Sequence, residues 1–156
     1  MAILSASEVF EFAVKVEENG ERFYRSVADR FQETAPREMF NFLAAEEKKH
    51  RETFTKLSHG ARQETPRPSY PDEYEAYLQA YADTLIFTDS ALKKEVERIT
   101  TVKEACEFGI RKELDSILYY QEIKNFVPEN ERDSLDSIIA EERRHFIKLT
   151  ELKREL

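Results

Sequence analysis

The chain has 156 residues, of which 40% are hydrophobic and 36% charged, and its length suits one domain over residues 1–156. Its net charge of −8 repels nucleic-acid phosphates and anionic lipids, so no nucleic acid and no membrane are expected as partners. The N-terminus has no basic leader, and no apolar stretch approaches the ~20 residues of a membrane span. These features predict a cytoplasmic protein.

The first predicted element is a helix over about residues 5–33. Ser5 is a suitable N-cap, with Glu8 three residues later, and apolar residues then recur at helical spacing. One carboxylate, Glu17, interrupts the apolar stripe.

A second helix is predicted over about residues 35–59, after Thr34. Its apolar stripe contains Glu47 and His50. The stretch that follows, "GARQETPRPSYP", is rich in turn-forming residues, so residues 60–100 are predicted to be a long crossover that contains one or two short helices.

Two more long helices are predicted, over about residues 101–126 and 129–155. The third helix has Glu113 in its apolar stripe, and the fourth has Glu142 and His145. Four long amphipathic helices with one long crossover predict an all-α protein, a four-helix bundle built from two helical hairpins.

The two halves of the chain repeat each other. The hexamer "AEEKKH" at 45–50 returns as "AEERRH" at 140–145. Positions of the first helix also correspond to positions of the third at a constant spacing: Glu17, Gly20 and Tyr24 correspond to Glu113, Ser116 and Tyr120. A duplicated helical hairpin with approximate two-fold symmetry accounts for both observations.

The repeated residues predict a metal centre inside the bundle. A Glu and a His three positions apart on a helix lie on one face, where both can bind one ion. Buried carboxylates are costly unless cations compensate them, and no Lys or Arg is expected on the inner stripes. Two divalent ions would balance four carboxylates, with two imidazoles completing the site. The candidate ligands are Glu17, Glu47, His50, Glu113, Glu142 and His145.

The neighbouring residues are assigned other roles. Glu46 and Glu141 are expected to point away from the centre, into salt bridges on a solvated face. Tyr24 and Tyr120 lie two turns beyond Glu17 and Glu113, where each phenol could hydrogen-bond a ligating carboxylate of another helix or could serve packing alone.

The segments "VEENGERFY", "AAEEKKH", "RKELDSILYY" and "IAEERRH", in this order, resemble rubrerythrin-type di-iron proteins of the ferritin-like superfamily. The resemblance implies a ferritin-like fold, two Fe ions with Mn or Zn as possible substitutes, and reduction of hydrogen peroxide or oxygen in oxidative-stress defence. A His in both halves is unlike iron-storing ferritins. The aromatic segment 70–87, together with this resemblance, also predicts a homodimer.

Two features depart from that family. Rubrerythrins usually carry a rubredoxin domain, whereas this chain has one Cys, so an external electron donor such as a rubredoxin-like protein is expected. Rubrerythrins also have an additional Glu one turn beyond the third-helix ligand, where this chain has Ser116. Two alternatives stay open: a ferroxidase or iron-handling protein, and a metal-free helical interaction module.

Overall fold

A computed structural model describes residues 5–61 and 72–156, and within these residues every regular element is helical. The α-helices are α1 Ala6–Arg30, α2 Thr34–Ala61, α3 Asp72–Leu85, α4 Asp89–Arg98, α5 Val102–Ile123 and α6 Arg132–Arg154. Two short 3₁₀ turns, η1 Lys124–Phe126 and η2 Glu129–Glu131, connect α5 to α6. The all-α class is as predicted.

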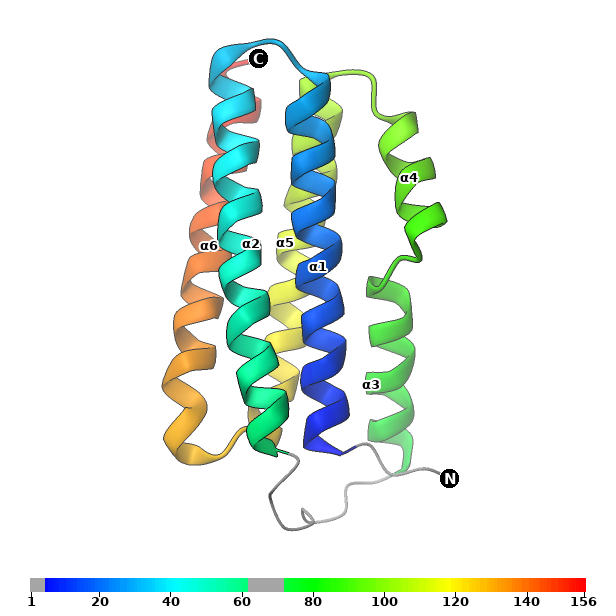
Figure 1. Ribbon diagram of the computed structural model, residues 1–156, viewed down its shortest axis with the longest axis vertical. Helices are drawn as coiled ribbons and strands as arrows, with labels where there is room; N and C mark the ends of the chain where they lie inside the picture. Colours follow the sequence, from blue (N-terminus) through cyan, green and yellow to red (C-terminus); the bar gives the residue numbers. More distant parts are fainter. Residues whose placement is uncertain (1–4, 62–71) are drawn as a thin grey trace.

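Helices α1, α2, α5 and α6 form the bundle, and α3 and α4 run along its outside, next to α1 and α5 (Figure 1). The four predicted long helices correspond to these four elements. Of the predicted crossover, residues 60 and 61 belong to the end of α2, residues 62–71 lie outside the described residues, and the remainder contains α3 and α4. No helix in the described part of the chain is both long and apolar enough to cross a membrane.

The predicted start of the fourth helix, at residue 129, is wrong by three residues. Pro128 has an extended backbone, and Glu129–Glu131 form a 3₁₀ turn before α6 begins at Arg132. The first helix begins as predicted. The Ser5 hydroxyl accepts from the Glu8 backbone N–H at 3.1 Å, and the Ser5 N–H donates to the Glu8 carboxylate at 2.7 Å. This capping box satisfies two backbone donors that a helix start otherwise leaves free.

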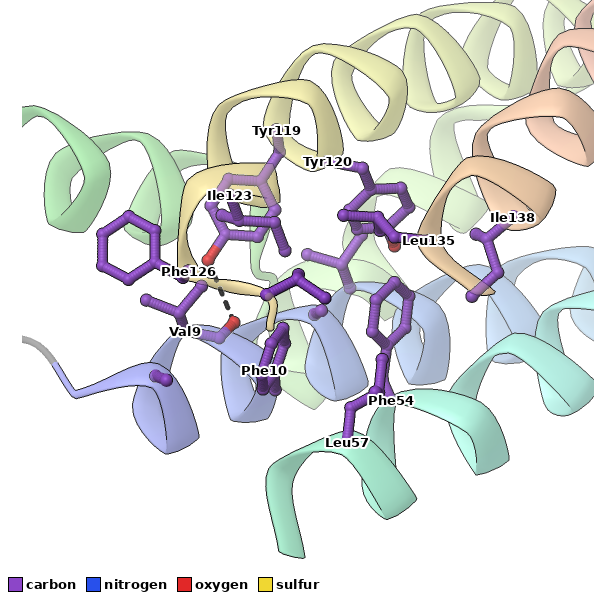
Figure 2. Close-up of a cluster of buried hydrophobic side chains, with 14 of the residues drawn as sticks. Val9, Phe10, Phe54, Leu57, Tyr119, Tyr120, Ile123, Phe126, Leu135 and Ile138 are labelled. Atoms are coloured by element: carbon purple, nitrogen blue, oxygen red, sulfur yellow. Dashed lines mark hydrogen bonds between the residues drawn. The ribbon is translucent and has the colours of Figure 1, made fainter. Parts of the chain in front are cut away.

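The apolar core consists of two clusters, one toward each end of the bundle. The first includes Val9, Phe10, Phe54, Tyr120 and Leu135, all fully buried. Figure 2 shows these side chains converging from α1, α2, α5 and α6, with the Tyr119 hydroxyl donating to the Val9 carbonyl at 3.2 Å. The second cluster includes Phe23, Tyr24, Phe40, Leu43 and Leu149. The predicted ligands occupy the level between the two clusters.

Side-chain hydrogen bonds attach the crossover to the bundle. The Tyr74 and Tyr81 hydroxyls of α3 donate to backbone carbonyls of α5, those of Glu122 and Asp115, at 3.0 and 2.8 Å. Between α3 and α4, the backbone N–H of Phe87 donates to the Asn19 side chain at 2.7 Å. Since Asn19 lies on α1 two residues after Glu17, this contact anchors the crossover at the level of the predicted site.

Candidate metal centre

All six predicted ligand residues come together in the middle of the bundle, and none is more than 2% exposed. They form two overlapping groups. One comprises Glu17, Glu47, His50 and Glu142, and the other Glu47, Glu113, Glu142 and His145, with ligand atoms within 4.8 Å of one another in each group. Glu47 and Glu142 belong to both groups and therefore link them.

Two tyrosines hold the outer carboxylates in a reciprocal arrangement. The Tyr24 hydroxyl of α1 donates to Glu113 Oε1 of α5 at 2.5 Å, and the Tyr120 hydroxyl of α5 donates to Glu17 Oε1 of α1. In both carboxylates the second oxygen, Oε2, is buried without a hydrogen-bond partner. Each tyrosine therefore occupies one oxygen and leaves the other free for the centre.

The atoms without partners test whether the site fits metal ions. Within the described residues, buried ligand atoms with no hydrogen bond are Glu17 Oε2, Glu47 Oε1, His50 Nδ1, Glu113 Oε2 and Glu142 Oε1. A buried polar atom without a partner costs about 1–3 kcal/mol, and more when the group is charged. Such atoms gathered in one place are the donor set of a carboxylate and imidazole metal site, so the residues fit the binding of metal.

The electrostatics of the centre also favour cations. Burial, together with Glu47 and Glu142, raises the pKa of Glu17 well above its usual value, and burial with the same two carboxylates raises that of Glu113. Burial alone would lower the pKa of His145, but its carboxylate neighbours outweigh it and raise the pKa to about 12. Without metal, the centre therefore retains protons that divalent ions would replace.

Glu141 corrects one prediction from the sequence. His50 Nε2 lies 2.5 Å from Glu141 Oε2, while His50 Nδ1 faces the centre, 3.3 Å from Glu142 Oε1. Glu141 therefore orients His50 through the ring nitrogen that faces outward, and the prediction that it points away from the site is wrong. Glu46 does form the expected ion pair, with Lys49 at 2.8 Å, but it also lies close to His50 and Glu141, with which it forms a third group of candidate ligand atoms within 4.8 Å of one another.

Lys112 corrects a second prediction. Its Nζ lies 2.8 Å from Glu47 Oε2, and its side chain is only 12% exposed. The expectation of no basic residue at the inner stripes is therefore wrong. Burial alone would lower the pKa of Lys112, but Glu47 and Glu113 outweigh it and raise the pKa above its ordinary value. Burial also raises the pKa of Glu47, yet Lys112 and His145 bring it below its usual value.

Ser116 is fully buried, and its Oγ has no hydrogen-bond partner among the described residues. It lies on α5 one turn after Glu113, at the position discussed above for an additional carboxylate. A serine there adds no negative charge to the four carboxylates.

Comparisons with known proteins agree with this site. The family model for rubrerythrin matches residues 8–153. A crystal structure from Thermotoga maritima, described as a ferritin-like diiron-carboxylate protein, is similar with a TM-score of 0.73 and 27% sequence identity, covering 99% of this chain and 98% of that one. A search of curated proteins gave no match. The fold is therefore ferritin-like, as predicted.

Proposed function

This chain belongs to the rubrerythrin family, and we propose that it is a non-haem di-iron protein that reduces hydrogen peroxide with electrons from an external donor. One observation carries the proposal: a Glu-x-x-His pair from each half of the chain faces the same buried carboxylate cluster. A single such pair is common on helix surfaces. Two pairs related by the duplication, both buried, support a two-metal centre.

The two groups suggest how the ligands would divide between two ions. Glu17 and His50 would hold one ion, Glu113 and His145 the other, and the remaining two carboxylates would serve both. Bound iron would supply the two electrons that break the oxygen–oxygen bond of hydrogen peroxide, which with two protons yields two water molecules.

The chain's own contribution would be to orient ligands and exclude water. The Tyr24 and Tyr120 hydroxyls fix Glu113 and Glu17, and Glu141 fixes the ring of His50. Outer partners of this kind keep ligands in one orientation and tune the metal. The apolar clusters at both ends of the centre keep bulk water away from the reacting atoms.

We propose that the electrons arrive from a separate protein, such as one of the rubredoxin type. These 156 residues contain one cysteine, Cys106, which is buried, so they cannot form the four-thiolate iron site of a rubredoxin. Four carboxylates would balance the four positive charges of two ferrous ions. Ser116, in place of an additional Glu, adds no further negative charge that would favour ferric iron. Loading and reduction should therefore be easy.

The test is anaerobic reconstitution with Fe(II), followed by mixing in parallel with H₂O₂ and with O₂. We expect about two Fe per chain by elemental analysis, and faster growth of the near-ultraviolet absorption of oxidised iron with H₂O₂ than with O₂. Faster oxidation by O₂ with release of iron would replace this proposal with a ferroxidase. If the protein retained no metal, the alternative of a metal-free helical interaction module would replace this proposal.

A ligand series tests the assignment of residues. Glu142→Ala should lose metal and retain helical circular dichroism, because removing a buried carboxylate also removes the cost of burying its charge. Glu52→Ala is the matched control, since Glu52 occupies an exposed position on α2. If Glu52→Ala loses metal and Glu142→Ala does not, the assignment of the inner face is wrong.

A further inference from the structure

The duplicated hairpins differ in charge at a position beside the centre. The spacing that relates Glu17 to Glu113 relates Val16 to Lys112. Val16 is buried as an ordinary core residue, whereas the side chain of Lys112 reaches Glu47 on α2, with Nζ 2.8 Å from Oε2. The two-fold symmetry of the ligands is therefore broken by one positive charge, on the α5 side only.

Gly20 provides the space for this charge. A Cβ on Gly20 would overlap Lys112 Cε and Nζ as well as Glu47 Oε2. Gly in a helix interior costs about 1 kcal/mol relative to Ala, so its presence in the middle of α1 needs a local reason. The close approach of the ammonium and the carboxylate to the α1 backbone supplies that reason.

We propose that Lys112 is a resident cation of the metal centre: seated against Gly20, its ammonium binds Glu47 Oε2 while the centre is empty and competes with metal ions for this oxygen. The proposal rests on the proposed function only in requiring that the centre binds divalent metal. Lys112 can compete with metal because it contacts Glu47, and Glu47 belongs to both ligand groups. A competitor at Glu47 therefore affects the binding of both ions.

The side chain has room to withdraw when an ion takes the carboxylate. A cavity of about 20 Å³ lies between α1, α5 and the crossover, lined in part by Lys112, Ser116, Phe108 and Leu92. This volume is enough for one water-sized group. An ammonium leaving Glu47 would meet the unpartnered Ser116 Oγ along this cavity.

The test compares Lys112→Met with wild type by titration with Co(II), using a chelator as competitor, and by unfolding of the metal-free protein. We expect Co(II) to bind about tenfold more tightly to the variant, the effect of removing a competing contact of ~1.4 kcal/mol. The metal-free variant should unfold at a lower temperature, because Glu47 loses its partner. Lys103→Met is the control, since it removes the same charge from an exposed position on α5.

A second variant, Lys112→Gln, tests the same competition between Lys112 and metal. Lys112→Gln keeps an amide that donates to Glu47, so it guards against failure to fold and should also bind Co(II) more tightly. Unchanged or weaker Co(II) binding in both Lys112 variants would overturn the proposal. Co(II) binding requires no turnover with peroxide, so a failure of the proposed peroxide chemistry and a failure of this inference give separate results.

Discussion

Replacing Glu113 by Gln tests whether the centre is strained without metal. The Tyr24 hydroxyl can still donate to the side-chain carbonyl, as it now does to Glu113 Oε1 at 2.5 Å. The new amide nitrogen would take the place of Oε2, which has no partner, and could donate to the free oxygens of Glu47 and Glu142. The change is nearly isosteric, so it alters charge and leaves packing intact.

The magnitude follows from the raised pKa of Glu113, which burial and its two carboxylate neighbours cause. Keeping a carboxyl protonated at pH 7, when its ordinary pKa is about 4.3, costs at most ~3.7 kcal/mol. Gln removes this cost, and replacing buried charged groups by neutral ones typically stabilises by ~1–4 kcal/mol. A gain of ~2 kcal/mol raises the unfolding temperature of a chain of this size by roughly 4–8 °C.

Thermal unfolding of the metal-free proteins, followed by circular dichroism, measures the gain in stability. Co(II) titration measures the other effect, because the group that contains Glu113 loses one ligand and its ion should bind at least ~100-fold more weakly. Glu97→Gln on exposed α4 surface is the control and should change neither quantity. A metal-free Glu113→Gln protein less stable than wild type, or one that still binds two ions tightly, would refute this reasoning.

Four further predictions concern the same molecule. Tyr120→Phe removes the hydrogen bond to Glu17 and should weaken Co(II) binding by about 10–100-fold without loss of helix content. Ser116→Glu should speed oxidation of Fe(II) by H₂O₂ or stabilise ferric iron, measured by stopped-flow absorption; a slower reaction without ferric stabilisation would contradict this. In the metal-free folded protein, His145 has a pKa raised to about 12, whereas in the unfolded chain a His releases its proton at its ordinary pKa of about 6.5. The proton on His145 therefore contributes fully to stability below about pH 6.5, and this contribution is lost as the pH rises toward about 12. Unfolding temperature should therefore fall between about pH 6 and about pH 9, and bound metal should reduce this dependence. We also propose a homodimer, because Tyr77 of the crossover stays 44% exposed; light scattering that gives a monomer mass at all concentrations would exclude it.

The positions of the six candidate ligands could be predicted because helical periodicity sets which side chains face inward. Glu47 and His50, one turn apart, had to share a face, and the duplication required the same of Glu142 and His145. The four long helices followed from the same periodicity. Their role as metal ligands stays a prediction that the titrations above address.

Lys112 and Glu141 were missed because the direction of a helix face does not limit the reach of a long side chain. Lys112 lies one position before Glu113, beside the inner stripe, and its flexible stem carries the ammonium around to Glu47. A signal existed in Gly20, whose cost in a helix interior indicates a close approach. For Glu141, the signal was that a ligating His needs a partner on its outer nitrogen.

The polar level of the bundle separates two apolar clusters, and this division affects how the helices open. In most helix bundles the middle of each helix is the most protected part and the ends fray. Here, without metal, the middle of each helix adjoins buried polar atoms that lack hydrogen-bond partners among the described residues, whereas apolar packing holds the helices on either side of it. The metal-free protein should therefore exchange amide hydrogens fastest near the middle of the bundle. Bound ions would connect the helices at that level and slow the exchange there.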